Sequence, residues 1–224
     1  MELMKSHRGW LSQYIGERFW RRAAISFAKK HHLVYFQQIN PENNKIPVIQ
    51  GTTTASIYTD KNVCIGSHAG YDIVFLERQS MVEFAKYAAS HHRWYVLQID
   101  LKRNTYLPFV FVGTRQQSKT YYARLLSSRP GLHYLMLETE AQNSAAFHSH
   151  YAIIAELSSL KTVSEIFHND IVTTMGHHLY PFSIELEKDS LILMTEAKKP
   201  NQQLMNKLLH FGLWFAKEVD KTEN

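Results

Sequence analysis

The chain has 224 residues, of which 45% are hydrophobic and 12% are aromatic, enough apolar side chains to build a sizeable core. Its apolar runs are too short to span a bilayer, and the N-terminus lacks the apolar stretch of a secretion signal. The single cysteine, Cys64, excludes an intramolecular disulfide and is typical of a reducing compartment. We therefore expect a folded cytoplasmic protein, or the soluble part of a membrane assembly.

The net charge of +5 comes entirely from the first thirty residues. This segment contains seven of the 25 basic residues and two of the 20 acidic ones, so the rest of the chain is neutral. Aromatic residues, including Trp10, Tyr14 and Trp20, are interleaved with these cations. A surface of that kind suits an anionic partner, either a phosphate backbone or lipid headgroups.

Charge is also segregated further along the chain. Residues 86–129 contain eight basic side chains and one acidic side chain, whereas residues 130–196 contain nine acidic and two basic ones. Either these stretches pack side by side and neutralise each other, which we favour, or a basic face survives folding. Within the first stretch Arg115, Lys119, Arg124 and Arg129 accompany two tyrosines and resemble the basic, aromatic N-terminal segment in composition.

The first predicted element is an amphipathic helix over residues 17–30. Its apolar residues recur at helical spacing and predict a buried face. Its basic residues fall on the opposite side: Arg18, Arg21, Arg22 and Lys29. Residues 10–15 form a second apolar patch in a different direction, so we expect a kink or a separate short helix near Gly16.

A strand-rich stretch follows. We expect strands at 33–39, 46–50, 56–59, 63–65 and 71–78, with a tight turn at residues 60–62. Ser80 and Glu83 have capping-box spacing, which predicts a short helix to about residue 89. Strands at 94–101 and 107–113 then form a hairpin.

In the last part of the chain we expect a helix at 118–127, a strand at 132–137, a polar loop at 140–146 and a strand at 148–157. A helix follows from Thr162, and residues 182–187 and 191–196 form a hairpin. Asn201 caps a last helix, whose broad apolar stripe predicts deep packing on a sheet.

These elements define an α+β fold with a mainly antiparallel sheet built from hairpins and covered by N-terminal and C-terminal amphipathic helices. The strands and helices do not alternate regularly, and no repeat of fixed period is present. We expect residues 1–224 to form one domain, with residues 127–145 as the candidate boundary if the chain is subdivided.

Thirteen histidines suggest a metal site. His148 and His150 lie two apart on a predicted strand and would project from the same face, and His177 or His178 could supply a third ligand. Because no cysteine or aspartate cluster accompanies them, we favour surface or hydrogen-bonded histidines, and we expect no cofactor.

Other catalytic signals are equally sparse. Glu185 and Glu187 share a strand face and could act as an acid–base pair, but their alternation with Ile184 and Leu186 is typical of the wet side of a strand. Asp72 and Glu77 are further carboxylate candidates. Cys64 lies in an apolar strand as a small core residue would. Neither a phosphate-binding loop nor a nucleophile elbow is present.

The leading hypothesis is a non-catalytic intracellular binding domain whose basic, aromatic N-terminal helix engages a nucleic acid, an anionic membrane surface or an acidic protein. The residues predicted to bind this partner are Arg18, Arg21, Arg22, Lys29, Arg115, Lys119 and Arg124. The alternative is a metal-assisted hydrolase that uses His148, His150 and a carboxylate on the sheet.

Overall fold

The computed structural model describes residues 3–39, 49, 57–84, 87–115, 119–137, 141–178 and 180–222. Its strands are β1 (Val34–Phe36), β2 (Ile57–His68), β3 (Tyr71–Phe84), β4 (Tyr87–Asp100), β5 (Leu107–Thr114), β6 (Leu132–Leu135), β7 (Tyr151–Glu156), β8 (Ser183–Lys188) and β9 (Ser190–Glu196). They form a nine-stranded sheet in the order β1-β2-β3-β4-β9-β8-β5-β7-β6. All the strand pairings in this part of the chain are antiparallel, which confirms the expected fold class.

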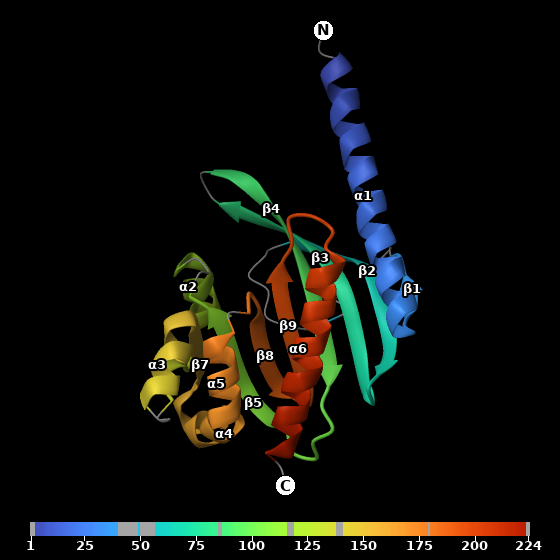
Figure 1. The fold of residues 1–224 in the computed structure, drawn as a ribbon. Helices are drawn as coiled ribbons and strands as arrows, with labels where there is room; N and C mark the ends of the chain where they lie inside the picture. The colour runs from blue at the N-terminus through green and yellow to red at the C-terminus, as the bar shows by residue number, and fades with distance from the viewer. Residues whose placement is uncertain are drawn as a thin grey trace.

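The helices are α1 (Leu3–His31), α2 (Lys119–Ser128), α3 (Ala141–His150), α4 (Leu160–Ile166), α5 (Asn169–His177) and α6 (Gln202–Lys221), with a 3-10 turn at Leu157–Ser159. The larger buried cluster lies on the sheet face that carries α1, α3, α4, α5 and α6 (Figure 1). A smaller cluster on the other face includes Tyr122 and Leu125 of α2 together with Ile49. No helix in the described ranges combines the length and apolar character needed to cross a lipid bilayer.

Helix α6 packs deeply on the centre of the sheet, as its apolar stripe predicts. The side-chain oxygen of Asn201 accepts a hydrogen bond from the amide of Leu204 at 3.0 Å and caps the helix. At Gly212 the helix comes so close that an added Cβ would lie 2.9 Å from Ile99 and 3.0 Å from Leu193. A larger residue at this crossing would force the ends of these side chains to shift.

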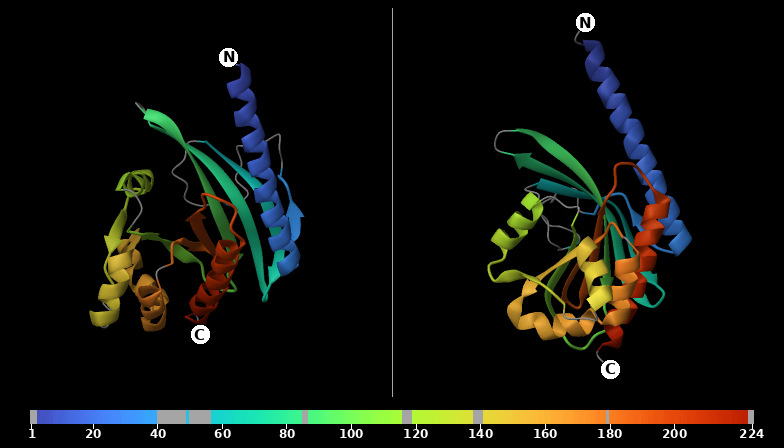
Figure 2. Two further views of the ribbon diagram at one scale, coloured as in Figure 1. Left: turned by 45° about the horizontal axis from the view of Figure 1, so that its top comes forward. Right: turned by 60° about the vertical axis from the view of Figure 1, so that its left-hand side comes forward.

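Helix α1 packs beside α6 at one edge of the sheet. Trp20, Ala24 and Phe27 are buried against the strands, and the α1 side chains Lys30 and His31 hydrogen-bond to Asn206 of α6. The N-terminal half of α1 extends past the end of the sheet (Figure 2). The separate short helix expected before Gly16 does not form, because α1 is continuous through this residue. A glycine costs only about 1 kcal/mol in a helix, which the surrounding turns tolerate.

Two predicted local features in residues 56–89 are also wrong. The predicted turn at residues 60–62 is a bulge within the single strand β2, where the register with β3 shifts between Lys61 and Cys64. The helix predicted from Ser80 is replaced by the end of β3 and the start of β4, which pair as far as Phe84 and Tyr87. Pairing with a neighbouring strand has overridden the local capping signal.

The predicted hairpin of residues 94–101 and 107–113 does not form. The two segments are strands β4 and β5, but β4 pairs with β3 and β9, whereas β5 pairs with β7 and β8. The predicted hairpin of β8 and β9 is confirmed, and Lys188 at its turn has a φ of 59°. Within the polar loop expected at 140–146, residues 141–146 are helical instead and belong to α3. The strand predicted at 46–50 falls outside the described residues except for Ile49.

Candidate anion-binding cleft

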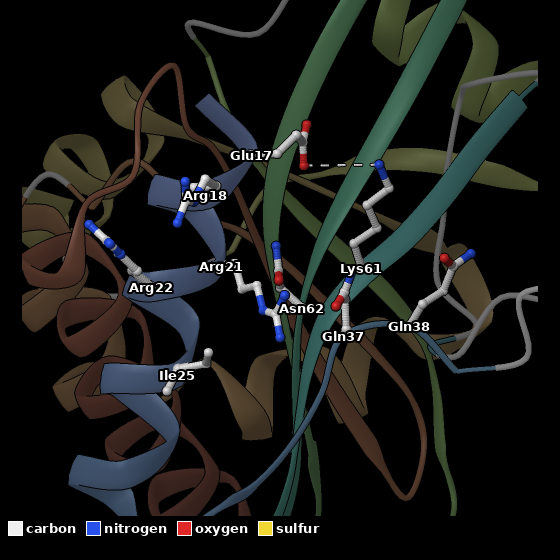
Figure 3. A pocket seen from close by; sticks show the side chains of 9 residues that line it. All are labelled: Glu17, Arg18, Arg21, Arg22, Ile25, Gln37, Gln38, Lys61 and Asn62. Carbon is white, nitrogen blue, oxygen red and sulfur yellow. Dashed lines mark ion pairs between the residues drawn. The ribbon is translucent and has the colours of Figure 1, made fainter. Parts of the chain in front are cut away.

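The arginine and lysine side chains that the structure describes in helix α1 are exposed, while the apolar side of the helix packs on the sheet. The buried residues Trp20, Ala23 and Phe27 recur every three or four positions and fix which side of the helix faces the strands. Residues on the other side are exposed to solvent: Arg18, Arg21, Arg22 and Lys29. The amphipathic helix is thus present, but Arg21 points toward β2 and not to the outer side (Figure 3).

A cleft of about 560 Å³ opens between α1, strand β2 and residues 37–38, which follow the edge strand β1 (Figure 3). Four basic side chains and one carboxylate contribute to its lining, together with three amides and one isoleucine: Arg18, Arg21, Arg22, Lys61, Glu17, Gln37, Gln38, Asn62 and Ile25. Arg21 extends from α1 toward β2, where Lys61 and Asn62 lie. The cleft is therefore concave and predominantly cationic.

Asn62 forms part of the cleft floor because of the bulge in β2. Its φ of 51° places it in the left-handed region, which asparagine tolerates better than most residues. Its backbone amide donates to the carbonyl of Gln37 at 2.8 Å. Bulges redirect side chains and occur often beside functional sites. Here the bulge directs the Asn62 amide toward Tyr35 and Glu77.

Beneath the floor, the carboxylate of Glu77 is 1% exposed and is surrounded by donors. It accepts hydrogen bonds from Asn62 at 2.7 Å, from Gln79 at 2.9 Å and from Arg93 at 3.0 Å. A buried carboxylate is tolerated only when such partners replace its hydration. The network therefore fixes the position of Asn62 from below.

Arg93 connects this network to helix α1. Its guanidinium bonds both Glu77 and Glu17 of α1, the latter at 2.5 Å, and lies 5.0 Å from the centre of the Trp20 ring. Lys61 is 4.0 Å from the same Glu17 carboxylate. The one carboxylate of the cleft is thus already paired, mainly with a cation outside the lining.

Arg21 lies beside Tyr35 of β1. Burial raises the pKa of Tyr35, and the nearby Arg21 guanidinium opposes this rise. The Tyr35 hydroxyl donates to the side-chain oxygen of Asn62 at 2.8 Å. Neither Arg21 nor Arg22 forms an ion pair with a carboxylate of the residues that the structure describes.

The second basic segment is not next to this cleft. Arg115 follows β5, and four strands lie between β5 and β2 in the sheet. At the usual spacing between neighbouring strands, β5 and β2 are about 24 Å apart. Arg115 is exposed and donates through Nε to the carbonyl of His148. Helix α2 carries Lys119 and Arg124, whose side chains lie outside the described part, and it packs on the other sheet face. The two basic segments therefore do not form one surface.

Part of the basic charge is neutralised by the acidic segment, as we favoured. Arg129 binds both carboxylate oxygens of Glu187, at 3.1 and 3.2 Å, and lies 3.9 Å from the centre of the Phe109 ring. Glu185 is 1% exposed, so its expected position on a wet strand face is wrong. Only Glu187 of this pair has the partly exposed position that the alternation predicts.

The geometry that suggested a metal site is absent. His148 and His150 belong to the end of α3 and not to a strand, because β7 begins at Tyr151. His148 is 8% exposed, and its Nε2 accepts a hydrogen bond from the amide of Leu137 at 3.2 Å. Burial, with a smaller contribution from Arg115, lowers its pKa. The described residues contain no group of three or more His, Cys, Asp or Glu suited to a metal ion.

The remaining candidates for chemistry have structural partners. Cys64 is fully buried, and its thiol donates to the carbonyl of Ala24 at 3.7 Å. Burial raises the pKa of this thiol to about 12, so it is protonated at neutral pH. Asp72 accepts a hydrogen bond from the hydroxyl of Ser67 on the neighbouring strand.

Sequence reasoning identified the arginines of the cleft but missed its opposite wall. Its lining residues there are Lys61 and Asn62 of β2 and Gln37 directly after β1, and their proximity to α1 depends on strand pairing. The one available local signal was the tendency of asparagine to adopt positive φ, which we interpreted as a turn and which forms a bulge.

No known protein family matches the sequence, and a search of curated proteins found no match. A search of solved structures matched the crystal structure of the mycobacterial trehalose monomycolate transport factor A, TtfA. The match has a TM-score of 0.56 and 12% sequence identity, and it covers 92% of this chain and 94% of that chain. At this identity the similarity is one of fold, and it extends over nearly the whole α+β architecture.

Proposed function

We propose that this chain is a non-catalytic binding domain that engages an anionic partner through helix α1 and the cleft beside it. The observation that carries the proposal is the charge of the cleft. Arg18, Arg21, Arg22 and Lys61 line the cleft with a single carboxylate, Glu17, which is already engaged by Arg93 and lies 4.0 Å from Lys61. An excess of cations in a concave site attracts anions and raises their local concentration.

The pairing of carboxylates in the acidic segment, residues 130–196, supports this proposal. Its Glu187 pairs with Arg129, and its Glu196 accepts a hydrogen bond from His92, so these carboxylates lie away from α1. Lys29 is exposed on the outer side of α1 beyond the cleft and extends the basic surface along the helix. A partner larger than the cleft can therefore contact the helix as well.

The direct test is binding to anionic probes at several salt concentrations. A fluorescent single-stranded oligonucleotide and anionic lipid vesicles represent the two partner chemistries that the basic surface suits. We expect at least one to bind, with an affinity that falls as salt rises because bound counterions are released. Reversing two charges with Arg21→Glu and Arg22→Glu should weaken that binding by about tenfold or more.

The matched control reverses two cations elsewhere, Lys161→Glu on α4 and Lys217→Glu on α6, both exposed. It has the same net charge as the test variant, so it separates the site from the total charge of the molecule. Equal losses in the two variants, or no binding of the unmodified domain to either probe in low salt, would reject the proposed function.

A further inference from the structure

The shape of the cleft restricts what can enter it. A volume of about 560 Å³ falls in the range of roughly 300–1,000 Å³ that small-molecule sites occupy. The arginines line a hollow between α1, strand β2 and residues 37–38 (Figure 3). The cleft therefore suits one discrete anionic group more than an extended polyanion.

The charges of the lining favour a doubly charged group. Arg21 and Lys61 approach from opposite walls, α1 and β2, and Arg18 and Arg22 add two further cations from the helix. The Glu17 carboxylate offsets only part of this charge and is shared with Arg93. A carboxylate or a phosphodiester supplies one negative charge, whereas a phosphate monoester carries about −1.5 to −2 at pH 7. Guanidinium groups also match phosphate oxygens through paired hydrogen bonds.

Arg21 is positioned before any ligand arrives. It lies beside Tyr35, whose hydroxyl bonds Asn62, and Asn62 in turn donates to the buried Glu77. Each member of this chain is fixed by the next, and the bulge fixes the backbone of Asn62. A cation held in place loses little conformational freedom on binding, which favours affinity for a small ligand.

We propose that the cleft binds a phosphate monoester, with Arg21 and Lys61 contacting the phosphate oxygens and Arg18 and Arg22 closing the rim. This inference rests on the proposed function and names the ligand of the same site. The group is carried either by a soluble phosphorylated compound or by a lipid headgroup. The amide of Gln37 on the strand side supplies donors and an acceptor for hydroxyl groups next to the phosphate.

The test compares methyl phosphate with dimethyl phosphate at constant ionic strength and pH 7.5, using NMR titration of the protein. These probes differ by one methyl group and about one charge. We expect the monoester to bind about tenfold more tightly. The preference should fade toward pH 5, because the monoester takes up its second proton near pH 6. Among the lining residues described, none is a histidine, and the titratable groups there are Glu17, Lys61 and the arginines.

A second arm separates the two sources of the phosphate. Vesicles containing phosphatidic acid present a monoester, and vesicles containing phosphatidylglycerol at equal surface charge present a diester. Preferential flotation with phosphatidic acid, without measurable binding of methyl phosphate, supports the lipid source. Binding of methyl phosphate with no vesicle preference supports the soluble source.

Two variants of α1 locate the site. Arg21→Gln should abolish the preference for the monoester. Arg21→Lys keeps the charge but lacks the planar guanidinium that can donate two parallel hydrogen bonds, so it should retain only part of the preference. Lys217→Gln removes one positive charge from an exposed position on α6, away from the binding surface, and should leave the preference unchanged. Thermal unfolding of each variant checks that the fold is retained.

Equal affinity for monoester and diester in both arms would overturn the inference, and so would a preference that survives Arg21→Gln. If the domain binds the oligonucleotide or anionic vesicles but discriminates in neither arm, the inference fails and the proposed function stands. If no anionic probe binds at all, both fail.

Discussion

The side-chain amide of Asn62 donates a 2.7 Å hydrogen bond to the buried carboxylate of Glu77, and this contact joins the floor of the cleft to the core. Asn62 has a left-handed backbone at a bulge, and Glu77 lies on the helix-covered face of the sheet opposite Tyr95 of β4. Strained backbone and buried charge both need support from the surrounding structure. Here the two features are joined by one hydrogen bond between neighbouring strands, β2 and β3.

The buried Glu77 should contribute strongly to stability. Glu77→Gln keeps the shape but removes the charge that Arg93 and Asn62 face, so the free energy of unfolding should fall by about 1–3 kcal/mol. The matched control is Glu187→Gln, whose partner Arg129 is partly exposed, and it should cost less than about 1 kcal/mol. Urea unfolding measures both values, and equal losses would contradict the role given to Glu77.

Glu17 should affect stability and binding in opposite directions. Glu17→Gln removes a carboxylate from the cleft, so affinity for methyl phosphate should rise by about twofold or more. The same change removes an ion pair with Arg93, which should lower the free energy of unfolding by up to about 1 kcal/mol. Glu165→Gln, in the exposed pair with Lys161, should change neither quantity. A lowered affinity in Glu17→Gln would show that its charge does not oppose the ligand.

Stability should decrease as the pH falls below about 6.5 because of His31. Burial is the main cause that lowers its pKa, with the neighbouring His68, Lys30 and His210 acting in the same direction, while the hydrogen bond to Asn206 opposes them. The unfolded chain then binds a proton that the folded chain does not, so acid favours unfolding. The stabilisation is complete above pH 6.5 and is lost as the pH falls toward the lowered value.

His31→Gln keeps a donor for Asn206 and should flatten the decline of the urea midpoint between pH 7.5 and 5.5. His148, whose pKa is also lowered, should account for part of the remaining slope. His133→Gln changes an exposed histidine and should give the slope of the unmodified protein. An identical slope in His31→Gln would exclude His31 as the source.

We expect alanine to have opposite effects on stability at two glycines, Gly212 and Gly16. A Cβ at Gly212 would come within about 3.0 Å of the side chains of Leu97, Ile99 and Leu193, so Gly212→Ala should destabilise the fold by about 1–3 kcal/mol. A Cβ at Gly16 would meet no atom within 4 Å, and alanine favours a helix, so Gly16→Ala should be neutral or stabilising by up to about 1 kcal/mol. Thermal unfolding distinguishes them, and a stabilised Gly212→Ala would contradict the close crossing of α6.

Elements with strong local signals could be predicted from the sequence. Three signals depend on neighbouring residues alone: the helical spacing of apolar residues in α1, the cap at Asn201 and the turn at Lys188. Alternation along β4 and β9 also identified them as strands. The choice of strand partner failed, because β4 pairs with β9 across almost a hundred residues and nothing local specifies that contact. Local signals failed as well at Ser80, which lies in a strand, and at residues 141–146, which are helical.

The residues of the candidate site also fall into those with a local sequence signal and those that depend on strand pairing. Arg18, Arg21 and Arg22 stood out because charge and helical period are local properties. Lys61 and Asn62 join them only through the pairing of β1 with β2 and the packing of α1 on both. The grouping of Arg115 with the N-terminal arginines rested on composition, which carries no information about the face or edge of a sheet on which a segment lies.

The most direct measurement of the central claim follows the arginine Nε–H signals during titration with methyl phosphate. We predict that the signals of Arg21 and Arg22 shift with saturation at one common affinity, while those of Arg115 and Arg129 stay in place. Shifts confined to Arg115, or small shifts of all arginines that grow with ionic strength alone, would contradict an anion site between α1 and β2.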